Sequence, residues 1–200
     1  MLIKKLLVAT NNPGKLAEVR GMLAGLPMEL LSLEDYDQLR EVNETGSSFE
    51  ENARLKATGY AVQTGLPALA DDSGLEVVSL DGRPGIHSAR YGGTNIGFAE
   101  KMAKLLRELD DAGDKKRVAR FVCSIAISDT AGKVLCTTAG ICQGRLAMCP
   151  RGNGGFGYDP LFIPDGFDQT FAELADEIKG KISHRARAFE KIIPILRGLL

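Results

Sequence analysis

Two adjacent aspartates, Asp71 and Asp72, follow the apolar run 67–70 and precede a glycine in the segment ADDSG. Carboxylate oxygens suit Mg²⁺, and a carboxylate held near a water molecule can also accept its proton. Because neighbouring residues of a strand point to opposite faces, we expect only one of the pair to enter a cleft while the other caps a turn. We favour Asp72 for the cleft; the alternative is that both aspartates are turn residues.

A third acid, Glu44, lies in the segment NETG, in a loop that we expect to converge on the aspartates. The two histidines, His87 and His184, are far apart and the four cysteines show no C-x-x-C spacing, so the sequence gives no support for a zinc site. Glu44 and Asp72, together with phosphate oxygens of a ligand, would form the oxygen-rich environment that magnesium prefers. Mg²⁺ is therefore the expected metal.

The segment TNNPGK, Thr10 to Lys15, follows a buried strand and opens a helix. The start of a helix presents backbone N–H groups and the positive end of the helix dipole, which together favour phosphate. The segment lacks the first glycine and the final hydroxyl of the Walker pattern, so it specifies no standard ATPase magnesium site. An ordinary helix cap is the alternative, but a lysine in the first turn opposes the dipole unless an anion offsets its charge.

The glycine-rich segment RGNGGFGYDP looks like a tight binding loop around Phe156, Gly157, Tyr158 and Asp159. An aromatic ring can stack on a nucleobase, and an acid held in a constrained turn can orient a ligand. The alternative is a packed Ω-type loop whose phenylalanine belongs to the core.

Several hydrogen-bond donors gather near the C-terminus, where Lys179 and Lys181 precede Ser183. The serine can cap a final helix that carries His184 and Arg185 at its start. Such a helix start presents many donors, so we expect an acceptor-rich partner there.

Irregularly alternating strands and helices must position these groups. Ser48 followed by Glu51 is a capping-box signature, which predicts a helix from about Phe49 to about Gly65. One face of that helix is expected to point inward and to combine apolar and polar groups: Phe49, Asn52, Ala53, Lys56 and Tyr60. The other predicted helices cover about 16–23, 99–109 and the segment from 189, which Pro194 interrupts or kinks, and the predicted strands cover 6–9, 67–70, 75–80, 118–128 and 134–141.

This pattern predicts an α/β fold with a mixed central β-sheet flanked by helices, in one domain that spans residues 1–200. Twenty-five basic and twenty-six acidic residues give a net charge of -1, so we expect no nucleic-acid partner and no attraction to anionic membranes. The apolar run within the first ten residues is too short for a signal peptide. No segment approaches the ~20 apolar residues of a membrane span. We therefore expect a soluble, cytoplasmic protein.

Six motifs together resemble those of the inosine triphosphate pyrophosphatase family, which acts on aberrant purine nucleotides such as ITP, dITP and XTP. The motifs are TNNPGK, ETG followed by F-x-E-N-A-x-x-K-A, ADDSGLEV, PGIHSARY, GGFGYDPLF and SHRARAF. They occur in the family's order from residue 7 to about residue 190, so nearly the whole chain takes part in the resemblance.

The resemblance implies a magnesium-dependent homodimeric hydrolase with two lobes around a nucleotide-binding cleft. It would cleave nucleoside triphosphates between the α and β phosphates and release the monophosphate and pyrophosphate. Asp72 would accept the proton of the attacking water and, with Glu44, would bind magnesium. The implied substrate contacts are Thr10, Asn11, Asn12, Pro13, Gly14, Lys15, Lys56 and Lys179 for the nucleotide and its phosphates, Ser73 for the substrate, Phe156, Gly157, Tyr158 and Asp159 for the nucleoside, and His184 and Arg185 for the purine.

The purine selectivity follows from hydrogen-bond chemistry. Hypoxanthine and xanthine carry a 6-keto acceptor where adenine carries an amino donor, so donors from His184 and Arg185 would pair with the keto form and lose their partners with adenine. Each buried unpaired group costs roughly 1 to 3 kcal/mol. Guanine also has a 6-keto group, so its rejection must arise near the 2-position. The alternative functions are another nucleotide phosphotransferase, such as a kinase, and a nucleotide-binding regulatory protein without hydrolysis.

Overall fold

The computed structural model describes residues 2–93 and 95–200, and the chain divides into two compact units. Unit 1 takes the residues up to Asp72, then Cys123–Gly140 and Arg185–Leu200. Unit 2 takes Ser73–Val122 and Ile141–His184. The expectation of one domain over residues 1–200 and of a cleft that binds a nucleotide stays a prediction.

The strands form one six-stranded sheet in the order β2-β1-β3-β4-β5-β6. The prediction of a mixed central sheet is confirmed. β1 is parallel to β2 and to β3, whereas β5 and β6 are antiparallel. A short turn around Asp129 joins β4 to its neighbour β5, which makes them an antiparallel hairpin because parallel neighbours need a long crossover. The strands are β1 (Lys5–Val8), β2 (Glu29–Ser32), β3 (Ala68–Val77), β4 (Val118–Ser128), β5 (Val134–Leu146) and β6 (Phe162–Pro164).

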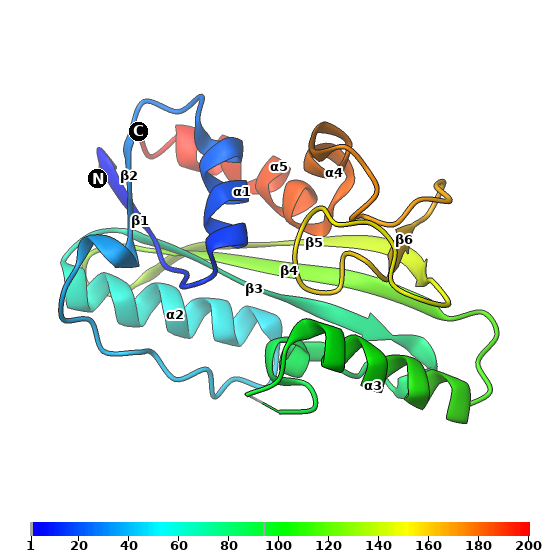
Figure 1. Ribbon diagram of the computed structural model, residues 1–200. Helices are drawn as coiled ribbons and strands as arrows, with labels where there is room; N and C mark the ends of the chain where they lie inside the picture. Colours follow the sequence, from blue (N-terminus) through cyan, green and yellow to red (C-terminus); the bar gives the residue numbers. More distant parts are fainter. Residues whose placement is uncertain (1, 94) are drawn as a thin grey trace. The chain divides into compact units, whose positions relative to one another are not determined.

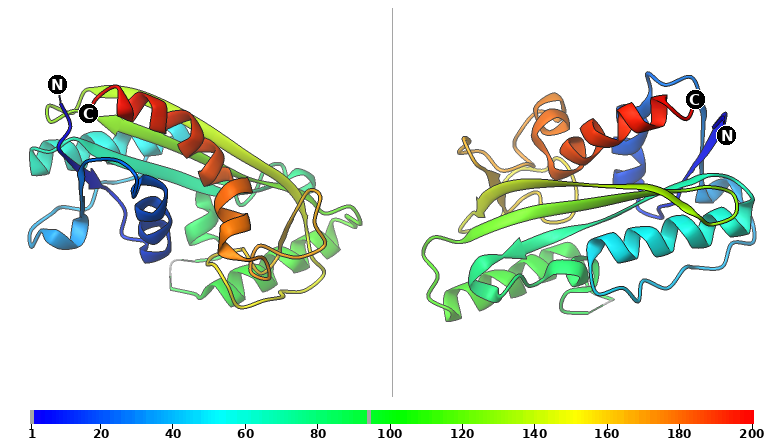
Figure 2. Two further views of the ribbon diagram at one scale, coloured as in Figure 1. Left: turned by 90° about the horizontal axis from the view of Figure 1, so that it is seen from above. Right: turned by 180° about the vertical axis from the view of Figure 1, so that it is seen from behind.

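Unit 1 has helices on both faces of its strands (Figures 1 and 2). In β1, Leu6 and Val8 pack with residues of α1 (Pro13–Leu23) and α5 (His184–Arg197), whereas Leu7 packs with residues of α2 (Phe49–Thr64). α5 belongs to unit 1 from Arg185 onward. This alternation along each strand decides which layer a strand side chain meets.

Local signals fix α2 at both ends. The side chain of Ser48 accepts a hydrogen bond from the Glu51 N–H, and Gly65 ends the helix in the left-handed conformation at φ 67°. The predicted inward face is confirmed, because Asn52, Lys56 and Tyr60 are all buried.

Unit 2 surrounds an aromatic core that includes Phe121, Phe162 and Phe171. Met102, Leu105 and other residues of α3 (Phe98–Asp111) belong to the same core. The remaining elements are the short helices η2 (Val78–Leu80) and η3 (Gly85–Arg90), and α4 (Asp176–Ile182); unit 1 contains η1 (Leu33–Asp35).

The structure corrects the expected elements in several places. β3 runs without a break through Asp71, Asp72 and Ser73, where the sequence indicated a turn. β5 extends to Leu146. α5 begins at His184, as expected for a helix that follows Ser183, and it is not interrupted at Pro194. β2, β6 and α4 were not expected, because each is too short to show a clear hydrophobic period.

No helix within the described ranges combines the length and the apolar character needed to cross a membrane.

Candidate functional site

β3 directs its two aspartates to opposite faces. Leu69 packs with the core beneath α1 and α5, whereas Ala68 and Ala70 pack with the core beneath α2. By the same alternation Asp71 points toward α1 and α5, and Asp72 points toward α2. Their partners agree with this arrangement, and the two aspartates anchor two separate clusters in unit 1.

The Asp72 cluster consists of Glu44, Asn52, Lys56 and Asp72. Lys56 Nζ lies 3.1 Å from Asp72 Oδ1 and 3.1 Å from Glu44 Oε1, so one ammonium group bridges two carboxylates. Asn52 Nδ2 donates a hydrogen bond of 3.2 Å to the other Asp72 oxygen. The structure therefore brings together the two acids that the sequence assigned to a metal and one of the lysines assigned to phosphate.

Opposing effects set the charge states in the Asp72 cluster. Burial lowers the pKa of Lys56, but Asp72, Asp71 and Glu44 outweigh burial and raise it above its ordinary value. Burial raises the pKa of Asp72, Lys56 opposes this shift, and the pKa stays above its ordinary value. A carboxylate with a raised pKa is a better proton acceptor than an ordinary aspartate once it is ionised.

Asn52 joins Asp72 to the loop that carries Glu44. Its Oδ1 accepts a hydrogen bond of 2.8 Å from the Gly46 N–H, while its Nδ2 donates to Asp72. The amide is completely buried. Sequence reasoning placed Asn52 on the inward face of its helix but assigned it no role; its position one helical turn before Lys56 was the available signal.

The Asp71 cluster consists of Lys15, Glu18, Asp71 and Arg185. Asp71 Oδ2 accepts from Arg185 Nη2 at 2.9 Å and Nε at 3.3 Å, and it lies 3.1 Å from Lys15 Nζ. Arg185 Nη1 pairs with Glu18 of α1. Arg185 is 1% exposed, so a fully buried guanidinium is held between two carboxylates.

The Asp71 cluster keeps its charges under deep burial. Burial raises the pKa of Asp71, but Lys15 and Arg185 outweigh it and hold the pKa well below its ordinary value. Burial lowers the pKa of Arg185, but Asp71 and the other negative groups around it outweigh burial and raise the pKa above its ordinary value. The sequence-based role of Asp71 as a turn cap is therefore wrong, because tertiary ion pairs and a continuous strand take the place of the turn.

The segment Thr10 to Lys15 does form the start of α1, with Pro13 in the first turn. Asn12 is the N-cap, and its Oδ1 accepts a hydrogen bond of 3.1 Å from the Lys15 N–H. Thr10 Oγ1 accepts another of 3.2 Å from the Asn12 N–H. The helix start thus has an internal cap, and the anion that offsets the Lys15 charge in this structure is Asp71.

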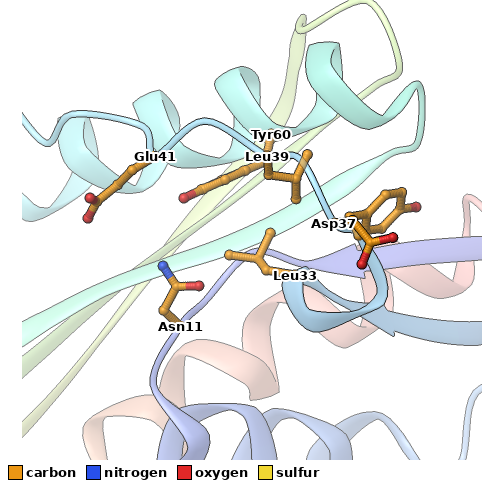
Figure 3. A pocket seen from close by; sticks show the side chains of 7 residues that line it. Asn11, Leu33, Asp37, Leu39, Glu41 and Tyr60 are labelled. Carbon is orange, nitrogen blue, oxygen red and sulfur yellow. The ribbon is translucent and has the colours of Figure 1, made fainter.

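Asn11 lines a pocket of about 260 Å³ in unit 1 (Figure 3). Two of the lining side chains are carboxylates, and none of the described residues that line it is a cation, so the pocket is unfavourable for a triphosphate. The other lining residues are Leu33, Tyr36, Asp37, Leu39, Glu41 and Tyr60.

In unit 2, the loop around Phe156 is built on an ion pair. Asp159 Oδ2 lies 2.7 Å from Lys179 Nζ and accepts a hydrogen bond of 2.8 Å from the Phe156 N–H. The Lys179 ammonium also lies 4.8 Å from the centre of the Phe156 ring. Tyr158 is buried and donates to the Ser88 carbonyl at 3.0 Å. Lys179 and the loop residues predicted to bind substrate are therefore neighbours.

The two remaining predicted contacts in unit 2 are His184 and Ser73. His184 stacks on Phe121, with ring centres 4.6 Å apart and planes 12° apart. Phe121 was not singled out from the sequence, since it looks like any core residue of a strand. Ser73 is half-buried in β3.

Gly155 allows the close turn between Phe156 and Asp159. It has φ +66°, and a Cβ at this position would overlap Asp159 Oδ2. We expect Gly155→Ala to separate Asp159 from Lys179 and to lower stability by roughly 1 to 3 kcal/mol. Urea unfolding measures the loss. Gly180→Ala is the control, because nothing lies within 4 Å of a Cβ there; equal stability of the two variants would contradict the expectation.

The Asp72 cluster fits magnesium on the chemistry of its donors. Within residues 2–93 and 95–200, no group of three or more His, Cys, Asp and Glu side chains is arranged to hold a metal ion. Glu44 and Asp72 nevertheless both contact one positive charge, the Lys56 ammonium. Magnesium commonly binds through one or two carboxylates and takes its other ligands from water and substrate phosphates. These two acids are suited to that mode.

Comparisons with known proteins agree with the motif resemblance. Residues 6–195 match the model of the Ham1 family. The dITP/XTP pyrophosphatase of Geobacter sulfurreducens is 52% identical over 184 residues, which cover 92% of each chain. That of an Exiguobacterium species is 46% identical and covers 97% of this chain and 100% of its own. A solved HAM1 protein from Coxiella burnetii is 40% identical with a TM-score of 0.89, over 99% of this chain and 100% of that one. The chain belongs to the Ham1 family.

Proposed function

We propose that this protein hydrolyses non-standard purine nucleoside triphosphates, such as dITP, XTP and ITP, to the monophosphate and pyrophosphate. The observation that carries the proposal is the Asp72 cluster, in which two carboxylates and a buried lysine meet on a chain of the Ham1 family. Relatives covering nearly the whole chain are dITP/XTP pyrophosphatases. A purely regulatory nucleotide-binding protein and a nucleotide kinase are not favoured.

Unit 1 supplies the groups for phosphate chemistry. Glu44 and Asp72 would hold Mg²⁺, which supplies positive charge to phosphate oxygens when it is bound. Asp72 accepts a proton from the attacking water, and Lys56 and Lys15 neutralise phosphate oxygens. Such reactions depend mainly on positioning and on charge stabilisation, which suits a cluster of charged groups held by buried hydrogen bonds.

Unit 2 supplies groups for the nucleoside. The Phe156 ring can stack on a base, and Tyr158 and Asp159 fix the loop that carries it. Lys179 assists at the phosphates, and His184 donates to the 6-keto group of the purine. The sequence also assigned Arg185 to the purine, but its guanidinium is held by Asp71 and Glu18 in unit 1, which suits it to holding the Asp71 cluster rather than to donating to a base.

The protein is further proposed to act as a homodimer in the cytoplasm. The family resemblance supports the dimer, and the balanced charge of the chain supports the absence of nucleic-acid and membrane partners.

A product-resolved assay tests the function. Purified protein is incubated with Mg²⁺ and each of ITP, dITP, XTP, GTP and ATP, and the products are separated. The expected result is monophosphate and pyrophosphate from the first three nucleotides. Diphosphate and free phosphate, or no product from any of the five, would exclude the proposal.

His184→Ala is expected to narrow the preference for ITP over ATP. Loss of one buried hydrogen-bond partner of the 6-keto group should lower the ratio of kcat/KM values by about 10-fold or more. Steady-state kinetics with both nucleotides measure the ratio. His87→Ala removes the other histidine of the chain, which is exposed, and should leave the ratio unchanged. An unaltered ratio in the His184 variant would remove His184 from purine recognition.

A further inference from the structure

Lys56 occupies the position between the two proposed magnesium ligands. Its ammonium lies at the same distance, 3.1 Å, from Glu44 Oε1 and from Asp72 Oδ1. The lysine is 9% exposed and comes from the inward face of α2. Opposite charges surround it, so the carboxylates are held near each other by an internal cation.

A metal ion bound by the same two carboxylates would meet that ammonium at short range. Two positive charges a few ångströms apart repel strongly in a partly buried site. The lysine has a flexible four-carbon stem and can withdraw, whereas both carboxylates are needed by the ion. Asn52 donates to the second Asp72 oxygen and accepts from the Gly46 N–H, and these two bonds link Asp72 to the loop that carries Glu44 without involving the ammonium.

We propose that Lys56 is an exchangeable internal cation, which a divalent metal ion displaces from Glu44 and Asp72, and which then becomes available to a phosphate. The inference rests on the proposed function, because it takes Glu44 and Asp72 as the metal ligands. It assigns Lys56 two successive partners: the carboxylates in the metal-free protein and the nucleotide phosphates after metal binding. A consequence is that Lys56 weakens metal binding while no nucleotide is present.

Lys15 provides a matched comparison within unit 1. It is also a lysine paired with an aspartate of β3 at 3.1 Å, but its partner is Asp71 on the opposite face of the strand. The exchange therefore involves Lys56 and not Lys15. Lys15 also acts on Asp72 through its charge, but less than Lys56 does, so removing the charge of Lys15 should affect a metal ion bound by Glu44 and Asp72 less than removing that of Lys56.

Direct Mn²⁺ binding without nucleotide tests the inference. Isothermal titration or the electron paramagnetic resonance signal of free Mn²⁺ gives the Kd of the full chain. Lys56→Met is expected to bind Mn²⁺ at least about tenfold more tightly than the wild type, because the competing charge is gone. Lys15→Met should change the Kd clearly less than Lys56→Met does, because its ammonium pairs with Asp71 and not with the two proposed metal ligands. Lys56→Arg keeps the charge and should bind as weakly as the wild type.

Equal or weaker Mn²⁺ binding by Lys56→Met would overturn the inference, since it would mean that the ammonium supports the metal site or is irrelevant to it. Lys56→Gln is measured in parallel in case Lys56→Met does not fold. The polar end of the glutamine can still form hydrogen bonds to the two acids. Failure of both the wild type and Lys56→Met to bind Mn²⁺ also overturns the exchange. The proposed function is judged separately by pyrophosphate release from ITP, so the two ideas can fail independently.

Discussion

Replacing Asp72 with asparagine is expected to remove most ITP hydrolysis while the protein stays folded. The amide keeps the shape of the side chain and can still accept from Asn52, but it cannot take a proton and it is a poorer magnesium ligand. Loss of general base catalysis alone lowers turnover by about 10²- to 10⁴-fold. The measurement is kcat for ITP with saturating Mg²⁺, together with circular dichroism to verify the fold.

Asp165→Asn is the control for Asp72→Asn, because Asp165 is an exposed aspartate of unit 2. That variant should keep wild-type kcat. Near-normal turnover of the Asp72 variant would show that another group activates the water, and the catalytic role would then have to be reassigned.

Replacing Asp71 with alanine is expected to cause a large loss of stability. Arg185 would lose the carboxylate that two of its nitrogens contact, and Lys15 would lose the carboxylate that offsets its charge at the start of α1. Leaving a buried charge without its partner costs roughly 3 to 5 kcal/mol. The free energy of unfolding from urea titration at pH 7 measures this loss.

Glu50→Ala is the matched control for Asp71→Ala. It also removes a carboxylate from an arginine, but the Glu50 and Arg54 side chains are about half exposed, at 51% and 48%. The expected loss is below about 1 kcal/mol. Similar losses for the two variants would show that burial does not strengthen the Asp71 pairs.

The pH dependence of stability gives a second test of Asp71. Because the folded-state pKa of Asp71 is lowered, its stabilisation is complete above the ordinary pKa of 3.8 and decreases as the pH falls toward the folded-state value. The difference in stability between wild type and Asp71→Ala should therefore shrink in acid. A difference that grows as the pH falls would contradict the pairing.

Local chemistry made some elements predictable. The limits of α2 follow from Ser48 and Gly65, whose conformations depend on their immediate neighbours. The hairpin of β4 and β5 follows from apolar strands around a turn with Asp129 and Gly132. In the same way, strand alternation was enough to place Asp71 and Asp72 on opposite faces.

Long-range pairing explains what the sequence could not reveal. Asp-Asp-Ser-Gly resembles a turn, but Asp71 is fixed in β3 by Arg185, which lies 114 residues further along the chain. Nothing near Glu18 indicates that its partner is Arg185 or that the arginine is fully buried. Phe121 likewise gains meaning only when His184 stacks on it. The clusters were predictable as a set of residue types, whereas the partners within each cluster were not.

The buried arginine at the start of α5 also bears on how the chain is made. Asp71 and Glu18 leave the ribosome 114 and 167 residues before Arg185 does. Until then unit 1 lacks the guanidinium that neutralises two of its acids, and α5 is missing from its core. Unit 1 can therefore reach its final packing only near the end of synthesis, whereas every residue of unit 2 has been added by His184.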